Sequence, residues 1–321
     1  MRKRTDKFFA VFMAVLLLIT LCACGQESSS ETTEKSDGSV TVVDMTGRTI
    51  TLDEPAERVV ALSASDCEIL YAIGAGDKLV GRGEYCDYPA EVSEVPSIQS
   101  GDDTNIEQII ALHPQVLLMS TMAQTDEQVA QLEAAGVHVV VSDAQDIEGV
   151  YNSIDIIGKL MGMEDNAGQI IDEMKQGFTE LEEKAADSGG EEKTVYFEVS
   201  PLEYGLWAAG NNTFMNEVAE MLGLKNCFDD VEGWAQISEE QVLERNPDYI
   251  VTITMYFGEG PTPEEEIMSR PGWGVVTAVA NGDILNLQDN ELSRPGPRLL
   301  DGAKMLYEFV YEGKDAADNA A

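Results

Sequence analysis

The sequence predicts an α/β protein made of two similar Rossmann-like lobes joined by one long α-helix. The first observation is a duplication: residues 105–118 (NIEQIIALHPQVLL) match residues 238–251 (SEEQVLERNPDYIV) at a constant offset of 133 positions. Solenoid repeats recur every 20–50 residues, so this offset indicates duplicated domains. The second observation is that strands alternate with helices on both sides of a long helical segment, which favours sheets that are mostly parallel and covered on both faces.

Each copy of the duplicated segment predicts a short helix followed by a buried strand. Asn105 and Ser238 are good N-caps, because their side-chain oxygens can accept hydrogen bonds from the first helical turn. Pro114 and Pro247 prevent the helix from continuing, and an apolar run follows each proline. One supersecondary unit therefore occurs once in each lobe.

The first lobe is expected to span residues 40–146. Its expected elements are a hairpin at Val40–Leu52, strand Arg58–Ser63, helix Ser65–Ile73, a short strand near Leu79–Gly81, the first copy of the duplicated unit, helix Asp126–Ala135 and strand Val137–Ser142.

Residues 147–188 contain no convincing strand and predict two amphipathic helices that separate after Met161. The second of them, Glu164–Ala186, would extend about 34 Å at 1.5 Å per residue, enough to link two lobes.

The second lobe, residues 189–312, repeats the alternation of strands and helices. The expected elements of this lobe are strand Thr194–Val199, helix Thr213–Leu222, the second copy of the unit, helix Glu264–Met268, strand Asp283–Leu287 and helix Arg298–Tyr311. Residues 313–321 form a polar tail.

The N-terminus has the layout of a secretory signal. Basic residues at 2–7 precede the apolar run Phe8–Leu21, which is too short to span a bilayer comfortably. The run ends in Leu-Cys-Ala-Cys-Gly, which resembles the bacterial lipobox and implies that residues 1–23 are removed and Cys24 is lipidated. Two incidental cysteines in an ordinary signal peptide are the alternative. Residues 24–39 would then be a flexible tether, and the protein would be extracytoplasmic and anchored to the cell membrane.

The net charge excludes one class of partner. The chain carries 20 Lys+Arg and 59 Asp+Glu, a formal charge of −39, and removal of the four basic residues and one acidic residue in 1–23 makes it −42. Such a field repels phosphates, so we expect no nucleic acid partner.

Three cysteines follow the tether: Cys67, Cys86 and Cys227. Cys67 and Cys86 can be bridged only if two neighbouring loops meet, which spacing does not show.

Catalytic and metal-binding motifs are missing from the sequence. Its two histidines, His113 and His138, are not placed beside a candidate nucleophile, and Gly-x-Ser-x-Gly, a P-loop and His-Glu-x-x-His do not occur. No spacing of metal ligands is present either. We therefore expect no enzyme, no catalytic residue and no resident cofactor or metal. A surface-anchored enzyme such as a glycosidase stays open as an alternative, because carboxylates are abundant.

Aromatic residues gather at predicted loops and strand-to-helix junctions. They are Tyr85, Tyr88, Trp207, Trp234, Tyr256 and Phe257. In open α/β sheets, ligands bind outside the carboxyl ends of the strands, and flat aromatic faces there suit a large, partly apolar ligand. Any one of these side chains can instead serve the core or rim. Together they predict a ligand cleft between the lobes.

Several motifs, taken as a set, resemble the substrate-binding proteins of ABC importers for ferric siderophores, haem and vitamin B12. They are the lipobox, Val42–Arg48, Arg58–Ser63, the duplicated unit, the long helix and Ser293–Gly302, and the similarity runs from about residue 40 to 312. The resemblance implies an ABC permease and ATPase as partners and a monomeric binding protein. It also implies that Glu107 and Glu240 pair with arginines of the permease, with Glu239 as the alternative to Glu240.

The cleft motifs are most similar to those of the members that bind vitamin B12. The matching segments are Tyr85–Pro89, Trp207 and Trp234–Ser238. The resemblance implies that the ligand is a cobalt corrinoid, bound by Tyr85, Trp207, Trp234, Tyr256 and Arg298. Two features depart from the pattern: Gln99-Ser100 occurs where a tryptophan is expected, and Cys227 has no partner.

An iron complex is the alternative cargo. A ferric siderophore would need several cationic side chains, for which Arg82, Arg294 and Arg298 are the candidates. Haem would need an axial Tyr or His, and neither histidine is well placed for that role.

Overall fold

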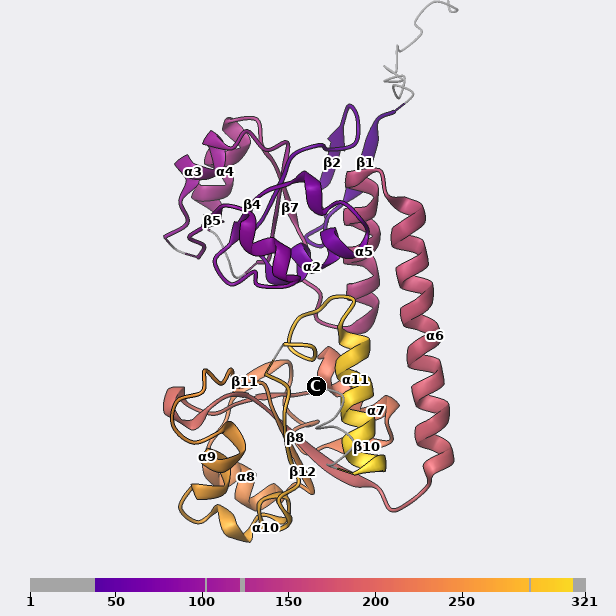
Figure 1. The fold of residues 1–321 in the computed structure, drawn as a ribbon, viewed down its shortest axis with the longest axis vertical. Helices are drawn as coiled ribbons and strands as arrows, with labels where there is room; N and C mark the ends of the chain where they lie inside the picture. Colours follow the sequence, from indigo (N-terminus) through magenta and orange to yellow (C-terminus); the bar gives the residue numbers. More distant parts are fainter. Residues whose placement is uncertain (1–37, 102, 122–124, 289, 314–321) are drawn as a thin grey trace, which may run out of the picture. The chain divides into compact units, whose positions relative to one another are not determined.

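The structure is a computed structural model that describes residues 38–101, 103–121, 125–288 and 290–313 (Figure 1). The expected signal peptide, the lipidation site Cys24 and most of the tether lie outside these ranges. Within them, none of the helices combines the length and the apolar character that crossing a membrane would require.

The first lobe contains the expected hairpin and a parallel sheet. Strands β1 (Val40–Val43) and β2 (Thr49–Leu52) pair antiparallel. The sheet has the strand order β5-β4-β3-β6-β7, and every pairing in it is parallel. Its strands are β3 (Val59–Ala61), β4 (Leu79–Gly83), β5 (Ser97–Ile98), β6 (Val116–Met119) and β7 (His138–Val141).

Helices cover both faces of this sheet because its strands bury both sets of alternating side chains. On one face, Val60 and Leu117 belong to the same apolar cluster as Ile109 of α3 and Leu132 of α4. On the other face, strand residues such as Val59 pack in a cluster that includes α2. The helices are α2 (Ala64–Ala72), α3 (Ile106–Ala111) and α4 (Asp126–Ala134). The parallel, doubly covered sheet predicted for this lobe is therefore confirmed.

Two long helices connect the sheets. Helix α5 (Ile147–Met161) ends at Gly162, whose positive φ of 68° forms a left-handed C-cap. Helix α6 (Glu164–Ser188) has 25 residues and lies beside α5 and beside α11 (Leu299–Tyr307) (Figure 1). Gly177 permits the close approach to α11, because a Cβ there would lie 2.5 Å from a methyl of Leu300.

The second lobe has a six-stranded sheet of order β11-β9-β8-β12-β13, with β10 also paired to β8. Strands β9 and β11 run antiparallel to their neighbours, whereas β8, β10, β12 and β13 are parallel. The elements are β8 (Lys193–Ser200), β9 (Trp207–Ala209), α7 (Phe214–Met221), β10 (Leu224–Asn226), β11 (Trp234–Gln236), α8 (Glu239–Arg245), β12 (Tyr249–Thr252), α9 (Pro263–Ser269), α10 (Thr277–Asn281), β13 (Ile284–Asn286) and α11. After α11, a π-helical turn occupies Glu308–Glu312, so the last expected helix is split.

The two copies of the duplicated sequence segment also have the same local structure. Strands β6 and β12 begin and end 133 positions apart, and each lies inside its sheet with a parallel strand on either side. The residue before each proline, His113 in one copy and Asn246 in the other, has positive φ values of 49° and 47°. Two lobes of similar build are therefore confirmed.

One apolar core extends through both lobes. It joins Val59 of β3 to Met174 and Phe178 of α6, and continues to Phe214 of α7 and Leu306 of α11. Shared burial of this kind resists separation of the lobes, because opening them would expose apolar surface to water.

Candidate functional site

One pocket of the second lobe lies at the carboxyl ends of β8 and β12 and has a volume of about 640 Å³. Tyr204, Tyr256 and Phe257 contribute to its lining. Tyr204 and Phe257 are 74% and 82% exposed, so both rings present surface to solvent at this pocket. The Tyr256 hydroxyl donates a hydrogen bond to the Gly260 carbonyl at 3.2 Å. The pocket lies where ligands of α/β sheets bind, and its volume suits a small-molecule ligand.

Glu198, which lines this second-lobe pocket, belongs to a buried ion pair. Glu198, at the end of β8, accepts two hydrogen bonds from Arg270, at 2.7 and 2.9 Å. Both side chains are 1% exposed. Arg270 also binds Glu266 and lies 4.5 Å over the Trp273 ring. Burial raises the pKa of Glu198, against the opposing effect of Arg270. The Arg270 charge is therefore balanced by carboxylates of the protein itself rather than by a ligand.

A second pocket, of about 270 Å³, is lined by both lobes. Serines that follow strands of the first lobe line one side: Ser63 after β3, Ser120 after β6 and Ser142 after β7. Trp234 and Arg294 come from the second lobe. These serines were not predicted, although their common position after a strand was a usable signal.

Trp234 contacts residues on two sides of this interlobe pocket. Its indole N–H donates to Gln145 Oε1 at 2.9 Å, and its ring packs against Phe214 with centroids 5.3 Å apart. The expected site residue therefore contacts the segment between β7 and α5, as well as its own lobe.

Asp66 is buried in the first turn of α2, near the interlobe pocket. No hydrogen bond of ordinary geometry reaches either of its carboxylate oxygens from the described residues. Burial is the main cause that raises the pKa of Asp66 to about 7; the nearby Ser142 hydroxyl lowers it, and the charge of Asp143 raises it. At neutral pH this carboxyl is thus close to half protonated.

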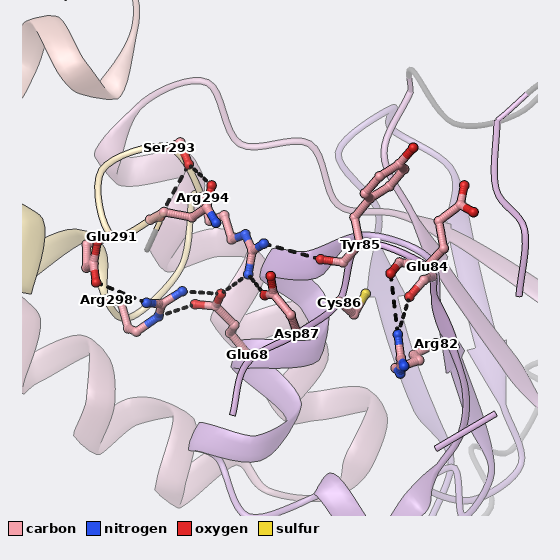
Figure 2. Close-up of polar contacts among 12 residues, drawn as sticks. Glu68, Arg82, Glu84, Tyr85, Cys86, Asp87, Glu291, Ser293, Arg294 and Arg298 are labelled. Atoms are coloured by element: carbon pink, nitrogen blue, oxygen red, sulfur yellow. Dashed lines mark hydrogen bonds and ion pairs between the residues drawn. The ribbon is translucent and has the colours of Figure 1, made fainter. Parts of the chain in front are cut away.

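An ion-pair network joins the two lobes (Figure 2). Glu68 of α2 accepts hydrogen bonds from Arg298 at 2.7 and 2.9 Å and from Arg294 at 3.0 Å. Arg294 also donates to Asp87 at 2.5 Å and to the Tyr85 carbonyl at 3.2 Å. Although burial raises it, the hydrogen bond from Arg294 holds the pKa of Asp87 below its usual value.

The network assigns partners to both arginines of the Ser293–Gly302 motif. Arg298 additionally lies 3.9 Å over the Tyr88 ring and lines a third pocket, of about 580 Å³, together with Glu68 and Tyr88. Its charge is therefore paired with the first lobe, and its role in ligand binding stays a prediction.

The five expected ligand residues are divided among different surroundings. Tyr256 lines the second-lobe pocket, Trp234 the interlobe pocket and Arg298 the third pocket. Tyr85, in the loop after β4, is 75% exposed, and Trp207, at the start of β9, is 39% exposed. Trp207 and Trp234 lie on neighbouring antiparallel strands, where Trp207 pairs with Gln236 and Trp234 with Ala209.

The two expected docking glutamates occupy equivalent positions. Glu107 and Glu240 are each the second residue of their helix, α3 or α8, and both are exposed. Backbone and Ser238 hydrogen bonding lowers the pKa of Glu240. Glu239 instead accepts a hydrogen bond from the Trp273 indole at 2.8 Å. Glu239 is half-buried, whereas Glu240 is exposed.

The chain thus has two covered α/β lobes, a shared apolar core and pockets at the carboxyl ends of strands. Residues 59–291 match the family described as "Periplasmic binding protein", and the chain belongs to this family. Its members are binding proteins, not enzymes, which agrees with the absence of catalytic motifs in the sequence.

Individual relatives refine this assignment. An ABC transporter substrate-binding lipoprotein of Bacillus subtilis, YvrC, is 34% identical over 97% of this chain and 98% of its own length. A vitamin B12-binding protein of Yersinia pestis is 31% identical over 79% of this chain and 86% of that protein. A solved structure of a possible iron-binding protein from Staphylococcus epidermidis is 31% identical, with a TM-score of 0.67 over 80% of this chain and all of that one.

Proposed function

We propose that this protein is the substrate-binding component of an ABC importer and that its cargo is a cobalt corrinoid. The corrinoid assignment rests on the observation that the candidate arginines of the cleft are already bound to other groups of the protein. An anionic siderophore needs free cationic side chains, whereas Arg294 and Arg298 are paired with Glu68. Arg82, the third candidate, donates to the carbonyls of Gly83 and Glu84. Exposed aromatic rings remain, and they suit a large, partly apolar macrocycle.

Similarity to the vitamin B12-binding protein of Yersinia pestis supports the same cargo. The possible iron-binding protein of Staphylococcus epidermidis supports an iron complex as the second candidate. Within the structure, exposed Tyr85 and Tyr204 are the side chains that a haem iron would find accessible. The corrinoid remains favoured because it needs neither a free arginine nor an axial tyrosine.

The transport role includes two further proposals. Cys24 carries a lipid that anchors the protein to the outer face of the cell membrane, in line with the lipoprotein name of the Bacillus subtilis relative. Glu107 and Glu240 dock the two lobes on the permease of the importer. Because each glutamate is exposed at the start of a helix, the pair can set the docking register without a large apolar interface.

Tryptophan fluorescence tests the cargo. The chain has three tryptophans, and Trp273 is fully buried, so ligand quenching should report Trp207 and Trp234. We expect saturable quenching of the full chain by cobalamin. Replacing either residue, as Trp207→Phe or Trp234→Phe, should reduce the fluorescence lost on ligand binding. The Trp273→Phe variant should lose as much fluorescence on ligand binding as the wild type.

Free tryptophan titrated with the same ligands corrects for their absorbance. Haem and a ferric siderophore form the comparison arms. Saturable quenching by one of the iron complexes, with none by any corrinoid, would assign the alternative cargo and leave the family unchanged.

A further inference from the structure

Two buried thiols of the first lobe meet at one backbone oxygen. Cys67 lies in α2 and Cys86 lies in the loop after β4, and both are free cysteines in the structure. The Cys67 sulfur lies 3.7 Å and the Cys86 sulfur 4.0 Å from the carbonyl oxygen of Ala61, the last residue of β3. Helix α2 and the loop after β4 therefore meet, which the sequence spacing did not reveal.

Hydrogen bonding between the two thiols is further support for their proximity. Contact with Cys86 is the largest cause that raises the pKa of Cys67, and burial follows it. The side chains are 0% and 1% exposed, so the pair is closed to solvent. Such thiols react slowly in the folded protein, because the thiolate is the reactive species.

The position of the pair connects it with the interlobe network. Glu68, which follows Cys67, accepts hydrogen bonds from Arg294 and Arg298. Cys86 is flanked by Tyr85 and Asp87, which both accept hydrogen bonds from Arg294 (Figure 2). A bond between the two sulfurs would therefore join the two segments that supply the first-lobe acceptors.

We propose that Cys67 and Cys86 form a disulfide that fixes α2 and the Tyr85–Asp87 loop as one rigid acceptor for the arginines of the second lobe. The oxidant is a small-molecule or protein disulfide. One cysteine thiolate attacks it to give a mixed disulfide and releases one thiol. The second cysteine thiolate then displaces the other thiol, so that two protein thiols are oxidised and one external disulfide is reduced to two thiols. The proposal does not depend on which ligand the protein carries.

Burial sets when the bond can form. Because the folded thiols are enclosed, oxidation should accompany folding and should be slow once the reduced protein has folded. Cys227 is an internal reference. It is also buried, its pKa is raised by burial to about 12, and it belongs to the second lobe.

Differential alkylation tests the bond on the full chain. The protein is unfolded, reduced and refolded in a buffer of oxidised and reduced glutathione, and its free thiols are blocked with N-ethylmaleimide in denaturant. After reduction, newly released thiols are labelled with iodoacetamide, and the state of each cysteine is determined by peptide mass spectrometry. We expect Cys67 and Cys86 to carry the second label and Cys227 the first. An unreduced digest should contain the linked peptide pair.

Two further measurements test the disulfide without changing Cys67 or Cys86, so a folding defect from replacing either residue cannot affect them. The oxidised wild-type protein should have a thermal midpoint about 5 °C above that of the reduced protein, because the bond closes a short loop of the unfolded chain. The Cys227→Ser variant should retain the linked peptide. Recovery of Cys67 and Cys86 as thiols after refolding, or a bond from either of them to Cys227, would overturn the proposal.

Discussion

Reversing the charge at both docking positions, as Glu107→Lys with Glu240→Lys, is expected to abolish import while leaving ligand affinity unchanged. Both side chains are exposed on α3 and α8, away from the residues that line the pockets. Under the proposed docking, each substitution replaces attraction to a permease arginine by repulsion, so the double variant should import at least about 100-fold more slowly. Uptake of labelled cobalamin by cells that lack the native copy measures the first effect, and equilibrium binding to the purified variant measures the second.

A matched variant controls for the altered net charge. Glu127→Lys with Glu244→Lys makes the same change of charge at exposed positions on α4 and α8. This control should import normally. Equal import by the two double variants would remove Glu107 and Glu240 from the docking role.

Replacing Asp66 by asparagine is expected to stabilise the protein at neutral and alkaline pH. The pKa of Asp66 is about 7 in the folded state and 3.8 as the reference value for the unfolded state. Below about pH 4 the carboxyl is protonated in both states, so the wild type and the neutral isostere should be similarly stable. Between about pH 4 and 7 the unfolded carboxyl ionises first, and folding of the wild type becomes progressively less favourable.

The difference should reach a plateau above about pH 7, with the variant more stable by roughly 4 kcal/mol at pH 8. Denaturant unfolding at a series of pH values measures it. The Asp77→Asn variant, which removes an exposed carboxylate from the same lobe, controls for net charge. A constant difference between Asp66→Asn and wild type from pH 4 to 8 would show that the buried carboxyl does not titrate as described.

Local signals made much of the fold predictable. The duplicated unit contains an N-cap, a proline and an apolar run in sequence, and the structure has α3 with β6 and α8 with β12 at the corresponding positions. Strands β9 and β11 were not predicted, because each has three residues and forms by pairing with a neighbour. Their stability depends on tertiary partners rather than on a sequence pattern.

The site was predictable as a set of residue types and less so as a geometry. Aromatic residues at loops indicated Trp234 and Tyr256, which do line pockets. The pairing of Arg298 with Glu68 spans 230 positions, and no local pattern announces it. That pairing matters most for function, because it determines whether an arginine is available to an anionic ligand.

The metal that the protein retains at equilibrium distinguishes a corrinoid cargo from an iron complex. The full chain is dialysed to equilibrium against a mixture of cobalamin, haem and a ferric siderophore at equal concentrations. Elemental analysis then gives the cobalt and the iron held per chain after correction for the external solution. A corrinoid carrier should retain cobalt in a stoichiometric amount with little iron. Stoichiometric iron with no cobalt would contradict the corrinoid assignment.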